Sequence, residues 1–179
     1  MGLYKYLHQA WRKQDSETLK KRMIEWRQGD TVVRVEKPLR LDKAHMLGYK
    51  AKKGIVVARV RVVRGGHKRT RPNKGRKSKR TTIRKTLKLN YKGIAERRAA
   101  SKYPNMEVLS SYWIGKDGEH YFFEVILVDK SSPEIKSDKE LSFITKATQG
   151  RAFRGLTSAG KKSRGLRNPA GQRPKRDIR

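Results

Sequence analysis

The sequence predicts an α+β protein in which helices flank a small, mostly antiparallel sheet. Apolar residues recur at helical spacing near the N-terminus, and alternating or continuous apolar runs typical of strands follow them. The 179 residues include 47 Lys and Arg but 16 Asp and Glu, which gives a net charge of +31. Much of this charge lies in two nearly acid-free stretches. We therefore expect one body with a long basic internal loop and a basic C-terminal extension.

Two helices are expected before the first strand. The first occupies about the first dozen residues, and its apolar side chains are Leu3, Leu7, Ala10 and Trp11. Asp15 or Ser16 can cap a second helix, for which Gly29 is the expected end. Trp26 lies on the apolar stripe of this second helix, so we expect it in the core.

Strands and a short helical turn follow. Residues 31–35 alternate as a short half-buried strand does, and Pro38 ends that strand. Asp42 is expected to cap a helical turn that closes at Gly48. A stronger alternation runs over residues 55–63.

The strand over residues 55–63 is expected to present different chemistry on its two faces. Val56, Ala58, Val60 and Val62 share one face, which should pack into the core. Arg59 and Arg61 share the other face, where they would offer guanidinium groups. The strand leads directly into the basic internal loop.

The second half of the body contains the clearest local signal. A helix is expected from Tyr91 to just before Tyr103. Residues 108–114 and 121–128 are β-prone runs joined by an Asp-Gly turn, so they predict a hairpin whose second strand lies mid-sheet. Ser137 and Glu140 have capping-box spacing ahead of a last short helix.

The two basic segments set the expected domain boundaries. No acid lies between Asp42 and Glu96, and residues 64–80 within that gap contain no large apolar side chain. Such a stretch cannot form a packed core. We expect a globular body over residues 1–149, interrupted by a basic arm at about 64–90, and a basic extension over residues 150–179.

Catalytic and metal-binding motifs are not recognisable. The chain has no cysteine, and its four histidines share no metal-ligand spacing. Residues 155–162 approach a phosphate-binding loop, but Lys162 stands where that motif needs Ser or Thr. The acids of residues 117–140 form no recognisable nuclease site. We expect no enzyme, cofactor, metal, small-molecule substrate or membrane span.

The charge favours a polyanion as the partner. Three interpretations stay open on composition: a structural RNA-binding protein, a DNA-compacting protein, or an enzyme acting on nucleic acid. Basic arms rooted in a small body favour the first, because such arms can fold between packed RNA helices.

Short motifs in order along nearly the whole chain resemble one protein family. They are MGLYKY at 1–6, LGYKAK at 47–52, RVRVVRGG at 59–66, AERRA at 95–99, VLSSYW at 108–113, FEVILVD at 123–129 and RGLTSAGKKSRGL at 154–166. Together they resemble the fifteen-e family of large-subunit ribosomal proteins, the archaeal and eukaryotic kind. Residues 70–92 depart from the family pattern.

The resemblance implies a structural constituent of the large ribosomal subunit, located in the cytoplasm and without a catalytic site. It implies large-subunit ribosomal RNA and neighbouring large-subunit proteins as partners, and we expect no homo-oligomer. The chain is shorter than eukaryotic relatives, so an archaeal source is expected.

The expected RNA-binding residues lie in the arm, at its root and in the extension. Those of the arm and its root are Arg59, Arg61, Arg64, Gly65, Gly66, His67, Lys68, Arg69, Arg71, Lys74, Arg76, Lys77, Lys79 and Arg80. Those of the extension are Arg151, Phe153, Arg154, Lys161, Lys162, Arg164 and Arg167. The cations would neutralise phosphates. Two interpretations of Phe153 stay open: it stacks on an unpaired base, or it packs back against the globular body.

Overall fold

A four-stranded antiparallel sheet is the centre of the fold. The computed structural model describes residues 2–68, 74, 84–85, 87–146 and 149–167. The strand order is β1-β2-β6-β5, with bounds β1 Val32–Val35, β2 Ile55–Val63, β5 Met106–Lys116 and β6 His120–Asp129. The α+β class and the hairpin are confirmed, and β6 lies mid-sheet as predicted, paired with β2 and β5.

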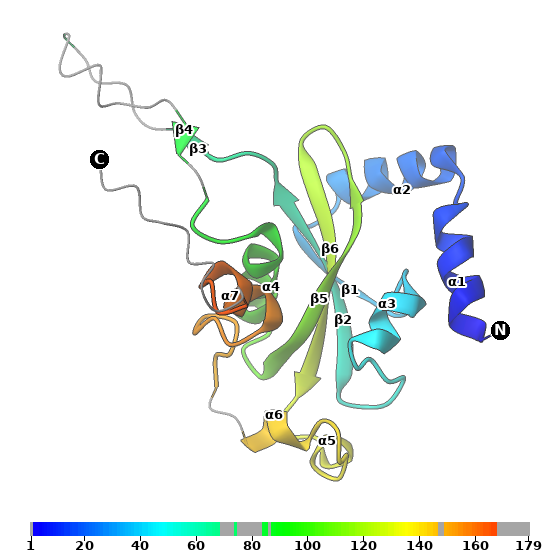
Figure 1. The fold of residues 1–179 in the computed structure, drawn as a ribbon, viewed down its shortest axis with the longest axis vertical. Coiled ribbons are helices and arrows are strands. Elements are labelled where there is room, and N and C mark those ends of the chain that lie inside the picture. The colour runs from blue at the N-terminus through cyan, green and yellow to red at the C-terminus, as the bar shows by residue number, and fades with distance from the viewer. Residues whose placement is uncertain (1, 69–73, 75–83, 86, 147–148, 168–179) are drawn as a thin grey trace.

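Helices cover both faces of this sheet (Figure 1). On one side lie α4 (Tyr91–Lys102) and α7 (Ser158–Ser163), and on the other α1 (Leu3–Arg12), α2 (Ser16–Gln28) and α3 (Leu41–Met46). Two further short helices, α5 (Pro133–Lys136) and α6 (Ser142–Lys146), follow β6 at one end of the sheet. The sequence did not predict α5 or α7.

The sheet is buried on both faces because β6 contributes apolar side chains to each. Phe123 and Val125 pack with Ala95 of α4 in one cluster. Phe122 and Ile126 pack with Trp26 of α2 in a second cluster, on the other face. This arrangement explains why residues 121–128 are a nearly continuous apolar run.

Of the two helix caps predicted for Asp15 and Asp42, the structure has the first but not the second. Asp15 caps α2, since its carboxylate accepts hydrogen bonds from the N–H groups of Glu17 and Thr18, and Gly29 follows the last helical residue as predicted. The prediction for Asp42 is wrong. Arg40 precedes α3, and Asp42 lies buried in its first turn, where it accepts from the Arg40 guanidinium at 3.1 Å.

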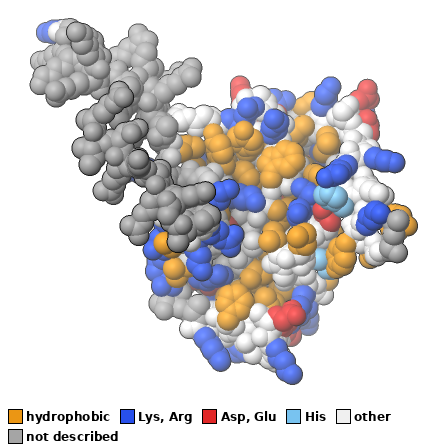
Figure 2. All heavy atoms as spheres, in the orientation of Figure 1, with side chains coloured by type: hydrophobic (Ala, Val, Ile, Leu, Met, Phe, Trp, Pro, Cys, Tyr) orange, Lys and Arg blue, Asp and Glu red, His pale blue; other side chains and the backbone are white. Residues whose placement is uncertain are grey.

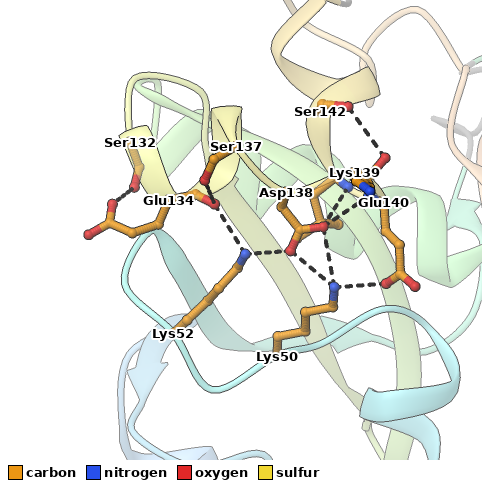
Figure 3. A network of polar contacts seen from close by, with 10 residues as sticks. Lys50, Lys52, Ser132, Glu134, Ser137, Asp138, Lys139, Glu140 and Ser142 are labelled. Atoms are coloured by element: carbon orange, nitrogen blue, oxygen red, sulfur yellow. Dashed lines mark hydrogen bonds and ion pairs between the residues drawn. The ribbon is translucent and has the colours of Figure 1, made fainter.

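The chain after β6 is held by a carboxylate that two lysines share (Figure 3). Lys50 Nζ lies 3.0 Å from Asp138 Oδ2, and Lys52 also donates to Asp138. Asp138 accepts from the N–H groups of Glu140 and Leu141. The predicted capping role of Ser137 is therefore wrong: Ser137 ends α5, and Asp138 satisfies the backbone ahead of α6.

Candidate nucleic-acid interface

The root of the basic arm is fixed to the body. Past the end of β2, the Arg64 guanidinium lies 5.1 Å from the centre of the Tyr121 ring and donates to the carbonyl of Asp117 at 2.6 Å. The next residue, Gly65, has a left-handed φ of +93° and donates its N–H to the Tyr91 hydroxyl at 2.9 Å. The arm therefore leaves the sheet beside the first turn of α4.

A two-stranded ribbon follows this root. β3 (His67–Lys68) pairs antiparallel with β4 (Arg84–Lys85), so the two ends of the internal loop lie side by side. Gly66 is exposed, and Lys74 is an exposed turn residue. Six predicted RNA-binding residues lie outside the described residues: Arg69, Arg71, Arg76, Lys77, Lys79 and Arg80. The predicted extension beyond residue 167 also lies outside them.

The arginines of β2 make contacts within the body. Arg59 lies over the Trp26 ring at 4.9 Å, and burial lowers the pKa of its guanidinium, although Glu25 and Glu124 oppose that shift. Arg61 donates to the carbonyl of Arg27, which follows from the approach of α2 to this face. The face that was expected to offer guanidinium groups therefore packs against α2, and both arginines are half-buried.

Residues 150–167 are packed against the body. The Glu107 carboxylate accepts from the N–H of Gly150 at 2.6 Å and of Arg151 at 3.2 Å. The Arg151 guanidinium donates to the Val108 carbonyl, and its burial lowers its pKa. The first part of the predicted extension thus begins along β5.

A buried carboxylate joins α4, β5 and α7. Glu96 accepts hydrogen bonds from the Ser111 hydroxyl at 2.6 Å and from the Thr157 hydroxyl at 2.5 Å. Burial raises the pKa of Glu96, while both hydroxyl donors act in the opposite direction. Thr157 is also the cap of α7, because its hydroxyl accepts from the N–H of Gly160. Thr157 therefore both caps the start of α7 and attaches this helix to α4 through Glu96.

Gly155 and Gly160 of this segment allow two stretches of backbone to pack closely against each other. A Cβ built on Gly160 would lie 2.6 Å from Gly155 Cα and 2.9 Å from Gly155 O. Gly155 itself has a φ of +67°. The pattern that resembled a phosphate-binding loop is explained by this backbone-to-backbone contact.

The cations of the packed segment remain at the surface. Arg154, Lys161, Lys162, Arg164 and Arg167 are all exposed. Phe153 is 48% exposed, and its carbonyl accepts from the Arg97 guanidinium. Phe143 of α6 is 50% exposed and lies 5.5 Å beneath the Arg151 guanidinium. Exposed aromatic rings among cations are the arrangement that binds unpaired bases.

Sequence reasoning missed the cations of α3 and α4. Lys43 is half-buried and Lys92 is exposed, and both line a hollow of about 610 Å³ that also includes Lys162. Their positions in short, ordinary helices give no signal of this convergence. Only the absence of acids between Asp42 and Glu96 could have indicated it.

Other classes of site find no support in the described part of the chain. No helix there is long and apolar enough to cross a membrane. Over the same described ranges, no three His, Asp or Glu side chains come together as metal ligands would. A small α+β body with a basic surface is typical of structural proteins that bind nucleic acid.

Comparison with known proteins narrows this class to one family. The model of the ribosomal L15 family, of the L15e kind, matches residues 2–178. The large ribosomal subunit protein eL15 of Methanocella arvoryzae is 52% identical over 170 residues, which cover 92% of this chain and 87% of that protein. The eL15 protein of Methanocorpusculum labreanum is 49% identical over 172 residues, covering 93% and 88%.

The chain belongs to the ribosomal L15e family. It is therefore a structural component of the large subunit of the cytoplasmic ribosome and not an enzyme, as the sequence motifs indicated. Both of these relatives come from archaea.

Proposed function

We propose that this protein binds and stabilises folded large-subunit ribosomal RNA through two basic surfaces. One is the arm that begins at Arg64. The other, which we call the C-terminal face, consists of residues 150–167. Neighbouring large-subunit proteins would meet the remaining surface of the body.

The main support for this proposal is the positive charge of the C-terminal face. Residues 150–167 contain six Lys and Arg and no acid. The acids that hold this segment, Glu96 and Glu107, accept from hydroxyl and backbone N–H groups. These donors satisfy the two carboxylates, so the exposed side chains of Lys161, Lys162 and Arg167 can face phosphates.

A salt titration with RNA tests the proposal. The probe is RNA extracted from large ribosomal subunits of Methanocella arvoryzae. Each phosphate contact should contribute about 0.7 to 0.9 to the slope of log affinity against log salt, so a multi-contact interface gives a steep fall. A slope near zero would contradict the proposal, as would equal affinity for random duplex DNA, which would favour DNA compaction.

A matched pair of variants locates the binding surface. Replacing Lys161, Lys162, Arg164 and Arg167 with Gln should lower the slope by about 3. The control replaces Lys20, Lys21, Lys136 and Lys139 with Gln, a similar loss of exposed cations elsewhere. Equal effects of the two variants would show that total charge, and not the C-terminal face, decides binding.

A further inference from the structure

A groove crosses the exposed edge of β5. Its floor is formed by residues 110–113 of β5, one wall by α3 and the other by α4 and α7. We name this hollow of about 610 Å³ the cation groove. Figure 2 shows Lys and Arg side chains on both sides of a band of apolar and uncharged surface on this face.

Five cations line the cation groove from three parts of the chain: Arg40, Lys43, Lys92, Lys162 and Arg167. Among the described lining residues only Glu96 is acidic, and its carboxylate accepts hydrogen bonds from the Ser111 and Thr157 hydroxyls. Within the described residues, Lys43, Lys92 and Lys162 have no acidic partner.

The positive charges of the cation groove affect the pKa of Lys92. The pKa of the Lys92 ammonium lies below its usual value, first through partial burial. Glu96 acts in the opposite direction, and the positive charges of Lys162, Lys43 and Arg40 add to the lowering. Arg40 is 9% exposed, and its Nε has no hydrogen-bond partner within the described residues. Arg40 is already paired with Asp42, but Lys43, Lys92 and Lys162 converge with no ion pair among the described residues, and such an arrangement favours an anion between them.

The other lining groups match a nucleotide. Trp113 is 36% exposed on the floor, and Tyr91 adds a second ring in the wall. Ser110 and Ser158 add hydroxyl groups to the lining that can reach the edge of a base. Aromatic stacking beside cations is how proteins hold unpaired bases of RNA.

A peptide strand fits this edge less well than RNA. An added strand would need the outward carbonyls of β5. Two of these already accept hydrogen bonds from arginines: Val108 O from Arg151 and Trp113 O from Arg40. The floor is thus closed to strand pairing at both ends, while the walls attract phosphate.

We propose that the cation groove takes an unpaired nucleotide of large-subunit ribosomal RNA, with phosphate between the α3 and α4 lysines and the base against Trp113. This inference rests on the proposed function and names a contact within it. It adds Lys43, Lys92 and Trp113 to the binding surface.

Two kinds of variant separate the parts of this contact. With the Methanocella arvoryzae RNA as probe, Lys43→Gln with Lys92→Gln should lower the salt slope by about 1.4 to 1.8. Trp113→Ala should weaken binding about five- to a hundredfold and leave the slope unchanged, whereas Trp113→Phe should retain most of the affinity. The matched charge control is Lys136→Gln with Lys139→Gln, which should change neither.

Lysine acetylation followed by peptide mass spectrometry gives a direct readout on the unaltered protein. Lys43 and Lys92 should react in the free protein and be protected in the RNA complex, while Lys136 and Lys139 react in both. If RNA binds with a steep slope but Lys92 still reacts, the groove proposal is overturned and the proposed function stands. If Lys92 is protected only in whole subunits, another protein occupies the groove, which also overturns the proposal. Failure of the wild-type protein to bind RNA would instead refute the proposed function.

Discussion

Replacing Gly160 with Ala tests how α7 is attached to the body. The added Cβ would lie 2.6 Å from Gly155 Cα, 2.7 Å from Gly155 C and 2.9 Å from Gly155 O. All three atoms belong to the backbone, so no side-chain rotation can relieve the contact. The start of α7 must move, and the Thr157 hydroxyl would move with it relative to Glu96.

The size of the effect follows from two opposing contributions. Overpacking of a close contact costs about 1 to 3 kcal/mol. Ala is a better helix former than Gly by up to about 1 kcal/mol, which offsets part of that cost. We expect the attachment of residues 150–163 to weaken by about 1 to 2 kcal/mol.

Amide hydrogen exchange measures this local change. The N–H of Lys161 donates to Thr157 O at 2.8 Å, and the N–H of Arg164 donates to Gly160 O at 3.1 Å. Their protection should fall about 5- to 30-fold in the Gly160→Ala variant. Gly118→Ala is the control, since no atom lies within 4 Å of the added Cβ. Unchanged or increased protection in Gly160→Ala would refute the close packing of α7 on Gly155.

Three further outcomes are expected. The raised pKa of Glu96 means that its contribution to stability is fully present below its ordinary value of 4.5 and is lost as pH rises through its folded pKa. The pH dependence of urea midpoints for wild type and Glu96→Gln should therefore differ in that window, and parallel curves would contradict it. The hydrogen bonds from Lys52 and Lys50 lower the pKa of Asp138, so Asp138→Asn should destabilise at neutral pH, by a margin that shrinks as pH falls below 3.8. Thermal melts at pH 7 and pH 2.5 would show this, and an equal deficit at both would oppose it. Gly54→Ala should lower the urea midpoint by the equivalent of about 1 to 3 kcal/mol, because Gly54 has a φ of +83° and its Cβ would lie 2.8 Å from Ile135 Cγ1; a midpoint equal to that of wild type would show that this turn can relax.

Sequence reasoning succeeded where local chemistry decides the structure. The β5–β6 hairpin follows from two β-prone runs joined at Asp117-Gly118, although Gly118 has no positive φ and the Asp117 carboxylate holds the turn by accepting from the N–H groups of Glu119 and His120. The start of α2 follows from the Asp15 carboxylate. Both signals lie within a few residues of the structure they specify. The family motifs likewise indicated the family that the comparisons show.

The failures have non-local causes. Helix α7 contains Gly160 and is short, yet it forms because Thr157 reaches Glu96, 61 residues away in the chain. The face of β2 that carries Arg59 was predicted to offer guanidinium groups, because polar residues alternate with apolar ones along the strand. In the structure the Trp26 ring lies against the Arg59 guanidinium, 4.9 Å from it. The cation groove needs α3 on one side of the β5 edge and α4 and α7 on the other, and no sequence spacing encodes that arrangement.

The way Glu107 and Glu96 hold the C-terminal face has a consequence for exchange between ribosomes. Their partners are backbone N–H groups and buried hydroxyls, and such short-range hydrogen bonds are much less screened by dissolved ions than separated surface charges are. Salt that releases the protein from RNA should therefore leave residues 150–163 in place. A released molecule would keep this surface assembled, and it could bind another subunit without first having to order it again.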